Sequence, residues 1–191
     1  MREKKTGPRR SDAQRNRERI LEVALEELTG CPDAPLSAIA RKAGVGQATF
    51  YRNFPNREAL VLEIYRHEMQ QVTDSAAELL ECREPDEALR AWMDDLARFA
   101  MTKAGLAEAL RQAGSTPGAQ QPGPTPLLAA AELLLRANEE AGTIRPGVSA
   151  DDFSLAISGL WQIDPHTDWQ PRAAWLLDLV MDGLRAGAPG R

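Results

Sequence analysis

The chain has 191 residues, 43% of them hydrophobic, and a formal net charge of −5. This length fits one domain or two small ones, and no apolar run approaches the roughly 18 residues that cross a bilayer. The basic N-terminus is not followed by an apolar segment, which argues against a secretory signal. Cys31 and Cys82 are too few for a disulfide framework and have no metal-binding neighbours in the sequence, so a cytoplasmic location is expected.

The charge is distributed unevenly along the chain. Residues 1–66 carry 13 Lys and Arg against 9 Asp and Glu, a net charge of +4, whereas residues 67–191 carry 10 against 19, a net charge of −9. Exposed charges are screened beyond about 8–10 Å at physiological salt, so attraction to phosphates is local. The basic part is therefore expected to bind nucleic acid while the acidic part stays away from it.

The first ten residues are rich in Lys and Arg. They are interpreted either as a disordered, solubilising tail or as a flexible arm that follows the phosphates or enters the minor groove through Arg9 and Arg10. A first helix is expected to begin at Ser11, which suits a helix N-cap, and to end at Gly30.

The next stretch contains two short amphipathic segments joined by a glycine. Residues 36–57 read LSAIARKAGVGQATFYRNFPNR. Four apolar residues of the first segment fall on one helical face, namely Leu36, Ile39, Ala40 and Ala43. Gly44 supplies the positive φ that ends this helix and turns the chain, and the second helix is expected to bury Phe50 and Phe54. This pattern predicts a helix-turn-helix, whose second helix fits a DNA major groove.

The outward side chains of the second helix have the chemistry of base and phosphate contacts. Gln47 and Arg52 carry donors and acceptors that can read base edges, and Ala48 can contact a thymine methyl. Thr49 and Tyr51 offer hydroxyls for phosphate oxygens. A plain solvated helix would be expected to carry Lys or Glu, which are absent between residues 46 and 54. DNA binding is therefore favoured over a plain surface helix.

The sequence IARKAGVGQATFYRNFPNREAL resembles the DNA-binding signature of the TetR family of transcriptional regulators. The resemblance extends over about Ile20–Leu62, roughly the first third of the chain. It implies phosphate contacts at Tyr51, at Arg57 and at the helix N-terminus near Ser37. The chain departs from the family pattern at Gly46, where a capping Ser is usual, and at Arg57, where Lys is usual.

After this motif the sequence predicts helices alone. They are expected from Asn56 to about Cys82, from Pro85 to near Gly105, from Leu106 to Gln112, from Pro126 to Ala141, from Ser149 to before Asp164, and from near Asp168 to Gly187. The segment Gly114–Pro126 has seven Gly or Pro among thirteen residues and is expected to be a loop. No alternation typical of strands is present, so the prediction is an all-α fold of about nine helices.

Apolar and aromatic residues at helical spacing mark the interior of the acidic part. By spacing alone such residues belong more often to a core than to a ligand site. The family resemblance, however, implies an effector pocket between helices of the C-terminal domain, suited here to a hydrophobic or aromatic small molecule. The residues expected to line it are Trp92, Leu96, Phe99, Leu110, Leu128, Phe153 and Trp161.

The last two helices combine small residues with a near-heptad apolar spacing, which permits close helix packing. Packing within one chain is the alternative, but a dimer in which two helices from each chain form a four-helix bundle is favoured, because a palindromic operator requires a two-fold protein. The residues expected at this interface are Ala156, Gly159, Leu160, Leu177, Val180, Met181 and Leu184.

The sequence offers little for catalysis. His67 and His166 have no paired ligand nearby, and no nucleophile motif, phosphate-binding glycine loop or CxxC is present, so no enzyme activity, metal or cofactor is predicted. We expect a TetR-type homodimer with a basic arm (residues 1–10), a DNA-binding domain (residues 11–66) and an effector-binding and dimerisation domain (residues 67–191). It is expected to be a repressor that a hydrophobic small molecule releases from a palindromic operator. The alternatives are a constitutive regulator or architectural protein without effector, and a helical enzyme with an appended DNA-binding module.

Overall fold

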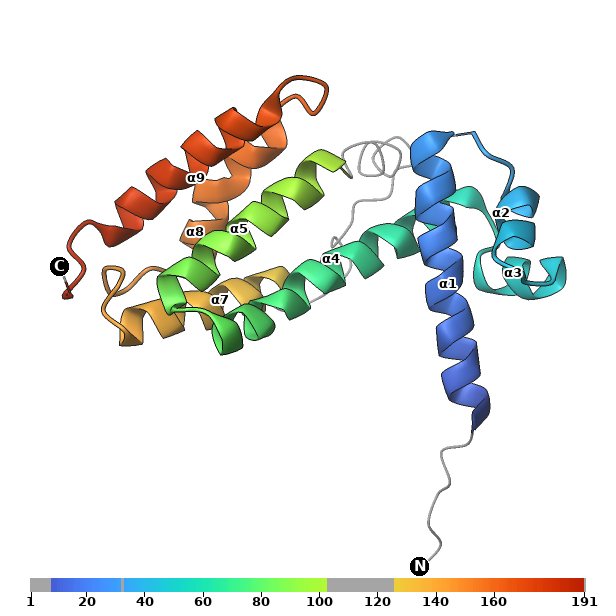
Figure 1. Cartoon of the computed structure of the whole chain (residues 1–191), viewed down its shortest axis with the longest axis horizontal. Helices are drawn as coiled ribbons and strands as arrows, with labels where there is room; N and C mark the ends of the chain where they lie inside the picture. The colour runs from blue at the N-terminus through green and yellow to red at the C-terminus, as the bar shows by residue number, and fades with distance from the viewer. Residues whose placement is uncertain (1–7, 32, 103–125, 191) are drawn as a thin grey trace, which may run out of the picture. The chain divides into compact units, whose positions relative to one another are not determined.

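The computed structural model describes residues 8–31, 33–102 and 126–190, with side chains from Gln14 onward. These residues form eight α-helices and one 3-10 helix, and none of them is in a strand, which confirms the all-α prediction. The elements are α1 (Pro8–Gly30), α2 (Leu36–Lys42), α3 (Gln47–Asn53), α4 (Arg57–Cys82), α5 (Pro85–Thr102), α7 (Pro126–Glu140), α8 (Ala150–Ile157), the 3-10 helix η1 (Ser158–Gln162) and α9 (Trp169–Arg185) (Figure 1).

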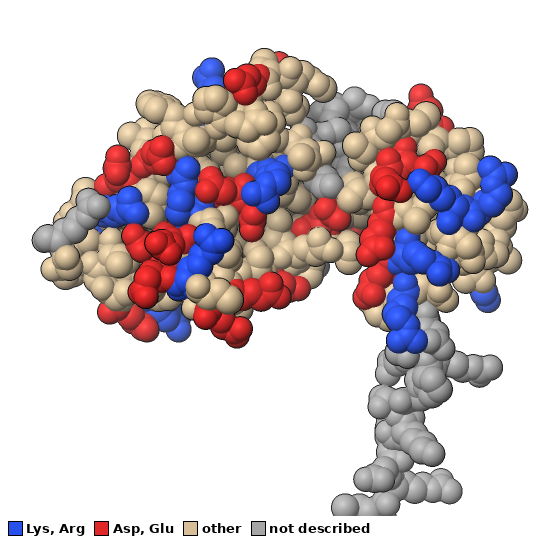
Figure 2. Space-filling view, viewed as in Figure 1, with Lys and Arg blue, Asp and Glu red and all other residues tan. Residues whose placement is uncertain are grey.

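The chain divides into two compact units, residues 1–67 and residues 68–191, and the division falls within α4. Acidic and basic side chains are both visible on each unit: they are intermingled on the second unit, whereas basic ones gather at the end of the first unit that carries α2 and α3 (Figure 2). Within the described ranges, no helix is both long enough and apolar enough to cross a membrane.

The first unit is built from α1, α2, α3 and the beginning of α4. α2 packs against both α1 and α3. The largest fully buried side chains of this unit come from all four helices and from the residue directly after α3. They are Ile20, Ile39, Phe50, Leu60 and Ile64, together with Phe54. α1 begins at Pro8, three residues before the expected start at Ser11, because proline needs no backbone donor in the first turn of a helix.

α4 has 26 residues, which corresponds to a length of about 39 Å. Asn56 caps its N-terminus, since the Asn56 Oδ1 accepts a hydrogen bond from the Ala59 N–H at 2.8 Å. Both the cap and the end at Cys82 agree with the prediction from the sequence.

In the second unit, α5 packs against α7, α9 and η1, and α8 packs against α7 and α9. Trp92 of α5 is fully buried, and its ring stacks on Phe153 of α8 with 6.4 Å between the ring centroids. The indole N–H of Trp92 donates to the Val72 carbonyl at 2.7 Å, which attaches α5 to α4. Trp92 therefore contacts both α4 and α8 from the centre of this core.

The helix ends of the second unit follow the predicted capping chemistry with one difference. Ser149 caps α8 by accepting from the Asp152 N–H at 3.1 Å, and Gly142 adopts a φ of +70° after α7. The expected single helix before Asp164 is instead the short α8 followed by η1. The expected helix at residues 106–112 and the loop before Pro126 lie outside the described residues.

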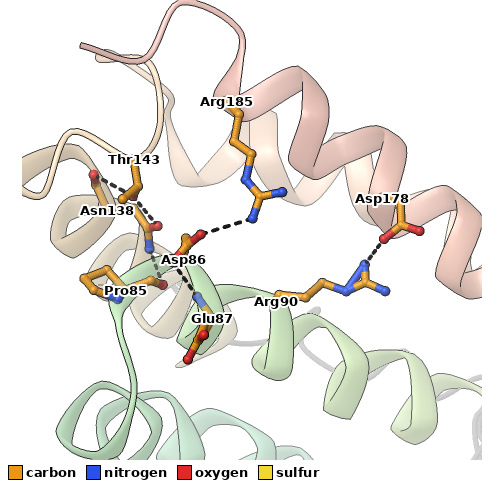
Figure 3. Close-up of polar contacts among 8 residues, drawn as sticks. All are labelled: Pro85, Asp86, Glu87, Arg90, Asn138, Thr143, Asp178 and Arg185. Atoms are coloured by element: carbon orange, nitrogen blue, oxygen red, sulfur yellow. Dashed lines mark hydrogen bonds and ion pairs between the residues drawn. The ribbon is translucent and has the colours of Figure 1, made fainter. Parts of the chain in front are cut away.

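A buried asparagine joins the end of α7 to the start of α5 (Figure 3). Asn138 has no exposed surface, and its Nδ2 donates to the carbonyls of Pro85 at 2.7 Å and of Leu134 at 2.9 Å. Its Oδ1 accepts from the Thr143 hydroxyl at 2.7 Å. Because a buried amide is costly unless its polar atoms are paired, these bonds fix how the two helices meet.

Two ion pairs attach α9 to α5 on the surface of the same unit. Arg185 Nη2 lies 3.1 Å from Asp86 Oδ2, and Arg90 Nη1 lies 2.7 Å from Asp178 Oδ1 (Figure 3). Partly exposed pairs of this kind contribute modestly each, so the packed core and the Asn138 network are the main constraints on the arrangement of these helices.

We expect Asn138→Ala to lower the free energy of unfolding by about 2–4 kcal/mol, because it removes the three buried hydrogen bonds that this side chain makes with the Pro85 carbonyl, the Leu134 carbonyl and the Thr143 hydroxyl. Urea denaturation at one fixed protein concentration measures this. The control is Gln70→Ala, which removes an exposed amide on α4 and should change stability by less than about 0.5 kcal/mol. Equal effects of the two substitutions would contradict a stabilising role for Asn138.

Candidate nucleic-acid interface

The turn between α2 and α3 has the geometry of a helix-turn-helix. Gly44 has a φ of +67°, which L-residues rarely adopt, and the Val45 N–H donates back to the Ala40 carbonyl at 3.0 Å. Gly46 stands at the N-cap of α3 and makes no side-chain cap, because it has no side chain to offer. The turn is therefore closed by backbone hydrogen bonds alone.

The structure brings five of the predicted DNA contacts together on α3. All five are exposed: Gln47, Ala48, Thr49, Tyr51 and Arg52. Phe50 and Phe54 are fully buried and lie 5.6 Å apart between ring centroids. These two rings fix which face of α3 points outward.

Hydrogen bonds within α3 involve Thr49 twice. Arg52 Nη2 donates to the Thr49 hydroxyl at 3.2 Å, and Asn53 Nδ2 donates to the Thr49 carbonyl at 2.8 Å. The guanidinium of Arg52 is thus held beside the hydroxyl that was expected to contact phosphate. Helical spacing of three residues could have indicated this pair.

The four other predicted contacts are placed differently. Ser37 is exposed near the start of α2, whereas Arg57 is half-buried and its guanidinium donates to the Ala34 carbonyl before α2. Arg57 therefore also anchors the α1–α2 connection, a role that its position in the sequence does not reveal. Arg9 and Arg10 lie in the first turn of α1, and their side chains are outside the described part.

An ion-pair cluster attaches α2 to α1. Lys42 Nζ lies 2.8 Å from Glu26 Oε2 and 2.9 Å from Glu27 Oε1. Hydrogen bonding from Lys42 and its charge lower the pKa of Glu26, and hydrogen bonding to Glu26 first and Glu27 next raises the pKa of Lys42 above its ordinary value. Lys42 thus stays protonated and partly neutralised by α1. The positive charge of Lys42 therefore helps to hold α2 against α1.

The residues predicted to line an effector pocket are not alike in burial. Trp92, Leu96, Phe99 and Phe153 are buried and Leu128 is half-buried, but Trp161 is 40% exposed and so lies on the surface rather than in the expected interior. Leu110 lies outside the described residues. Trp161 lies in η1, and the buried residue of η1 is the neighbouring Leu160.

A surface hollow of about 400 Å³ lies between α7 and the start of α8. None of the predicted ligand-binding residues lines it. Its lining is mostly polar and consists of Glu132, Leu135, Arg136, Glu139, Val148, Ser149, Ala150 and Asp151.

The seven residues predicted for a dimer interface divide between the core and the surface. Leu160, Leu177, Met181 and Leu184 are buried within their own unit, Gly159 and Val180 are half-buried, and Ala156 is exposed. The near-heptad spacing marks one face of α9, but that face packs inside the chain. Spacing alone does not distinguish burial within a chain from burial between chains.

A different set of large apolar side chains is exposed on the same elements. The exposed fractions are 73% for Leu155, 40% for Trp161, 65% for Trp175 and 55% for Leu179. Trp175 and Leu179 are one turn apart on α9 and lie on the face opposite the core. The sequence did not reveal this set, because the dimer interface was predicted on the neighbouring apolar stripe.

The described residues contain no group of three or more His, Cys, Asp or Glu arranged to hold a metal ion. Both cysteines are exposed and free.

A helix-turn-helix unit followed by a second helical unit with its own core defines a class of two-part, all-helical DNA-binding regulators. The family model described as "Bacterial regulatory proteins, tetR family" matches residues 20–64, and that described as "Transcriptional regulator SbtR-like, C-terminal domain" matches residues 84–186. The chain belongs to the TetR family of transcriptional regulators.

Several solved structures share this fold. A TetR transcriptional regulator from Streptomyces coelicolor is 39% identical with a TM-score of 0.72, and the match covers 88% of this chain and 98% of that one. A TetR regulatory protein from Mycobacterium vanbaalenii is 35% identical with a TM-score of 0.73, covering 93% and 99%. FadR of Thermus thermophilus, a TetR-family repressor in complex with lauroyl-CoA, is 22% identical with a TM-score of 0.52, covering 88% and 94%. Comparison with curated protein sequences gave no match.

Proposed function

We propose that the protein is a homodimeric repressor that binds a palindromic operator and leaves it when a hydrophobic small molecule binds. Residues up to about 66 bind DNA, and residues 67–191 dimerise and bind the effector. The observation that carries this proposal is the face of α3, where polar side chains are exposed while Phe50 and Phe54 are fully buried.

The side chains of α3 suit the major groove. Gln47 and Arg52 have the donors and acceptors that distinguish base pairs, and Ala48 can contact a thymine methyl. Phosphate contacts then set the register of the helix on the duplex. They are made by Tyr51, Thr49, Arg57 and the start of α2 near Ser37. A two-fold dimer presents two such helices to successive major grooves, about 34–36 Å apart.

The exposed apolar face of α8, η1 and α9 supports a dimer. A Cβ added at Gly159 would lie 3.2 Å from a Leu176 methyl, so α9 approaches η1 closely at this point. Leu155 precedes Gly159 by one helical turn, and Leu179 follows Leu176 by nearly one turn. Leu155 and Leu179 are therefore available to pack against a second copy of the chain. A two-fold pairing of α8 and α9 makes a four-helix bundle.

The effector is proposed to act through the core around Trp92. A hydrophobic molecule that enters between α5 and α8 has to displace the Trp92–Phe153 stack and with it the hydrogen bond from Trp92 to Val72 of α4. The lauroyl-CoA complex of FadR suggests acyl chains as a first class to test. A shift of the DNA-competent population from about 99% to about 1% requires the ligand to favour the other state by about 5.5 kcal/mol.

One observation favours a second candidate, a constitutive regulator without effector. Trp92, Leu96 and Phe153 are almost completely buried among themselves and their neighbours, as in an ordinary close-packed core. The two candidates agree on DNA binding and differ in their response to ligands.

DNA recognition is tested with Gln47→Ala on the palindrome upstream of the protein's own gene. We expect a loss of about 1–3 kcal/mol of binding free energy on this operator and little change on a scrambled duplex, because a base contact is removed. Tyr51→Phe should weaken both duplexes alike, since it removes a phosphate contact. Mobility-shift titrations at fixed salt measure this, with Gln70→Ala as the matched control. Equal losses on both duplexes for Gln47→Ala would remove it from base reading.

The dimer face is tested with Leu179→Glu. A charge on this face should convert the dimer to a monomer in sedimentation and abolish high-affinity operator binding, because only a dimer engages both half-sites. Leu133→Glu is the control, since Leu133 of α7 is also exposed, at 44%, but lies off this face. A Leu179→Glu protein that remains dimeric would place the interface elsewhere.

The effector is tested by titrating the protein–operator complex with lauroyl-CoA and then with other hydrophobic molecules. A true effector should lower operator affinity at least about fivefold, and operator DNA should lower the protein's affinity for that ligand by the same factor, because coupling is reciprocal. Fluorescence anisotropy of labelled operator and calorimetry of the ligand measure the two sides. If no tested ligand lowers the operator affinity, the constitutive regulator is favoured.

A further inference from the structure

Arg17 of α1 contacts both α4 and the residue that directly follows α3. Its Nη2 lies 2.5 Å from Glu63 Oε2 on α4, and its guanidinium carbon lies 5.2 Å from the centroid of the Phe54 ring. The Arg17 side chain is one-third exposed. One side chain thus touches the beginning of α4 and the residue that ends α3.

Phe54 directly follows α3 and is packed against it. It is fully buried, its N–H donates to the Phe50 carbonyl at 2.9 Å, and the two phenylalanine rings lie against each other. A planar guanidinium over an aromatic face is attracted to the ring and restricts its tilt. A shift of Arg17 therefore changes a contact with the residue that directly follows α3.

Glu63 holds Arg17 in this position. One of its carboxylate oxygens accepts from Arg17, and the other accepts from Arg66 at 3.0 Å. Glu63 is mostly buried, whereas the Arg66 side chain is half exposed. Arg17 and Arg66 thus share a carboxylate, but the described contact with Phe54 is made by Arg17.

We propose that Arg17 is a positioning residue that sets the orientation of α3 for base reading, acting through Phe54 and held in place by Glu63. The inference rests on the proposed function of α3 in the major groove. The Arg17 and Glu63 side chains are only 33% and 26% exposed, so water and salt screen their attraction less than on an open surface. Base contacts depend on orientation more than phosphate contacts do, because bidentate hydrogen bonds to a base edge require a fixed geometry.

The test compares Arg17→Met and Arg17→Lys with the unsubstituted protein on the operator and on a scrambled duplex, over a series of salt concentrations. Arg17→Met should weaken operator binding about tenfold, in the range of one lost base contact, and leave scrambled binding and the salt dependence unchanged. Arg17→Lys should be intermediate, since Lys keeps the ion pair but lacks the planar stacking group. Arg66→Met is the matched control and should leave both affinities unchanged.

Glu63→Gln provides a second route, because it removes the negative charge that holds Arg17 without altering Phe54. It should reproduce the loss of discrimination, and combining it with Arg17→Met should add nothing further, as expected for two residues of one unit. Thermal unfolding of each variant checks that the fold is intact. Should Arg17→Met alone prevent folding, the comparison of Glu63→Gln with Arg66→Met decides the question.

Equal losses on both duplexes with a shallower salt dependence would mean that Arg17 itself binds a phosphate, and would overturn the inference. If Gln47→Ala abolishes discrimination but Arg17→Met and Glu63→Gln do not, the positioning role fails while the proposed function stands. If the unsubstituted protein does not distinguish the operator from the scrambled duplex, the proposed function fails and this inference fails with it.

Discussion

The burial of Phe50 and Phe54 is the interaction on which the DNA-binding face depends. α3 has only seven residues, too few for a stable helix in isolation, so its shape and orientation come from packing. Two aromatic rings on one side leave the polar side chains of the other side outward. Gly44 makes this possible, because its left-handed conformation lets α3 leave α2 at a sharp angle.

In the second unit the corresponding constraint is the pairing of polar groups inside an apolar core. Trp92 fills space beside Phe153 and donates its single N–H to Val72, while Asn138 satisfies carbonyls on two helices. Each group restricts how its helices meet, because misalignment would leave a buried donor or acceptor unpaired. The unit is thereby given one arrangement of helices, from which the outer faces of α8 and α9 follow.

Local chemistry made the helix-turn-helix, the Asn56 and Ser149 caps and the long α4 predictable from the sequence. Contacts between distant residues were not predictable in this way. The Arg17–Glu63 pair joins positions 46 apart, and helical spacing gives no partner for either residue. The burial of the apolar stripes of α9 was not predictable either, because Leu177 and Leu179 both belong to such stripes. Packing against α5, α8 and η1 is what makes the Leu177 stripe internal.

The tryptophans report on different parts of the second unit. Trp92 is enclosed in the core, Trp169 is half-buried at the start of α9, and Trp161 and Trp175 are exposed to water. Emission from an indole shifts to shorter wavelength as water is removed from it. The natural chain thus contains optical probes of its outer helices and of its interior, with no label attached.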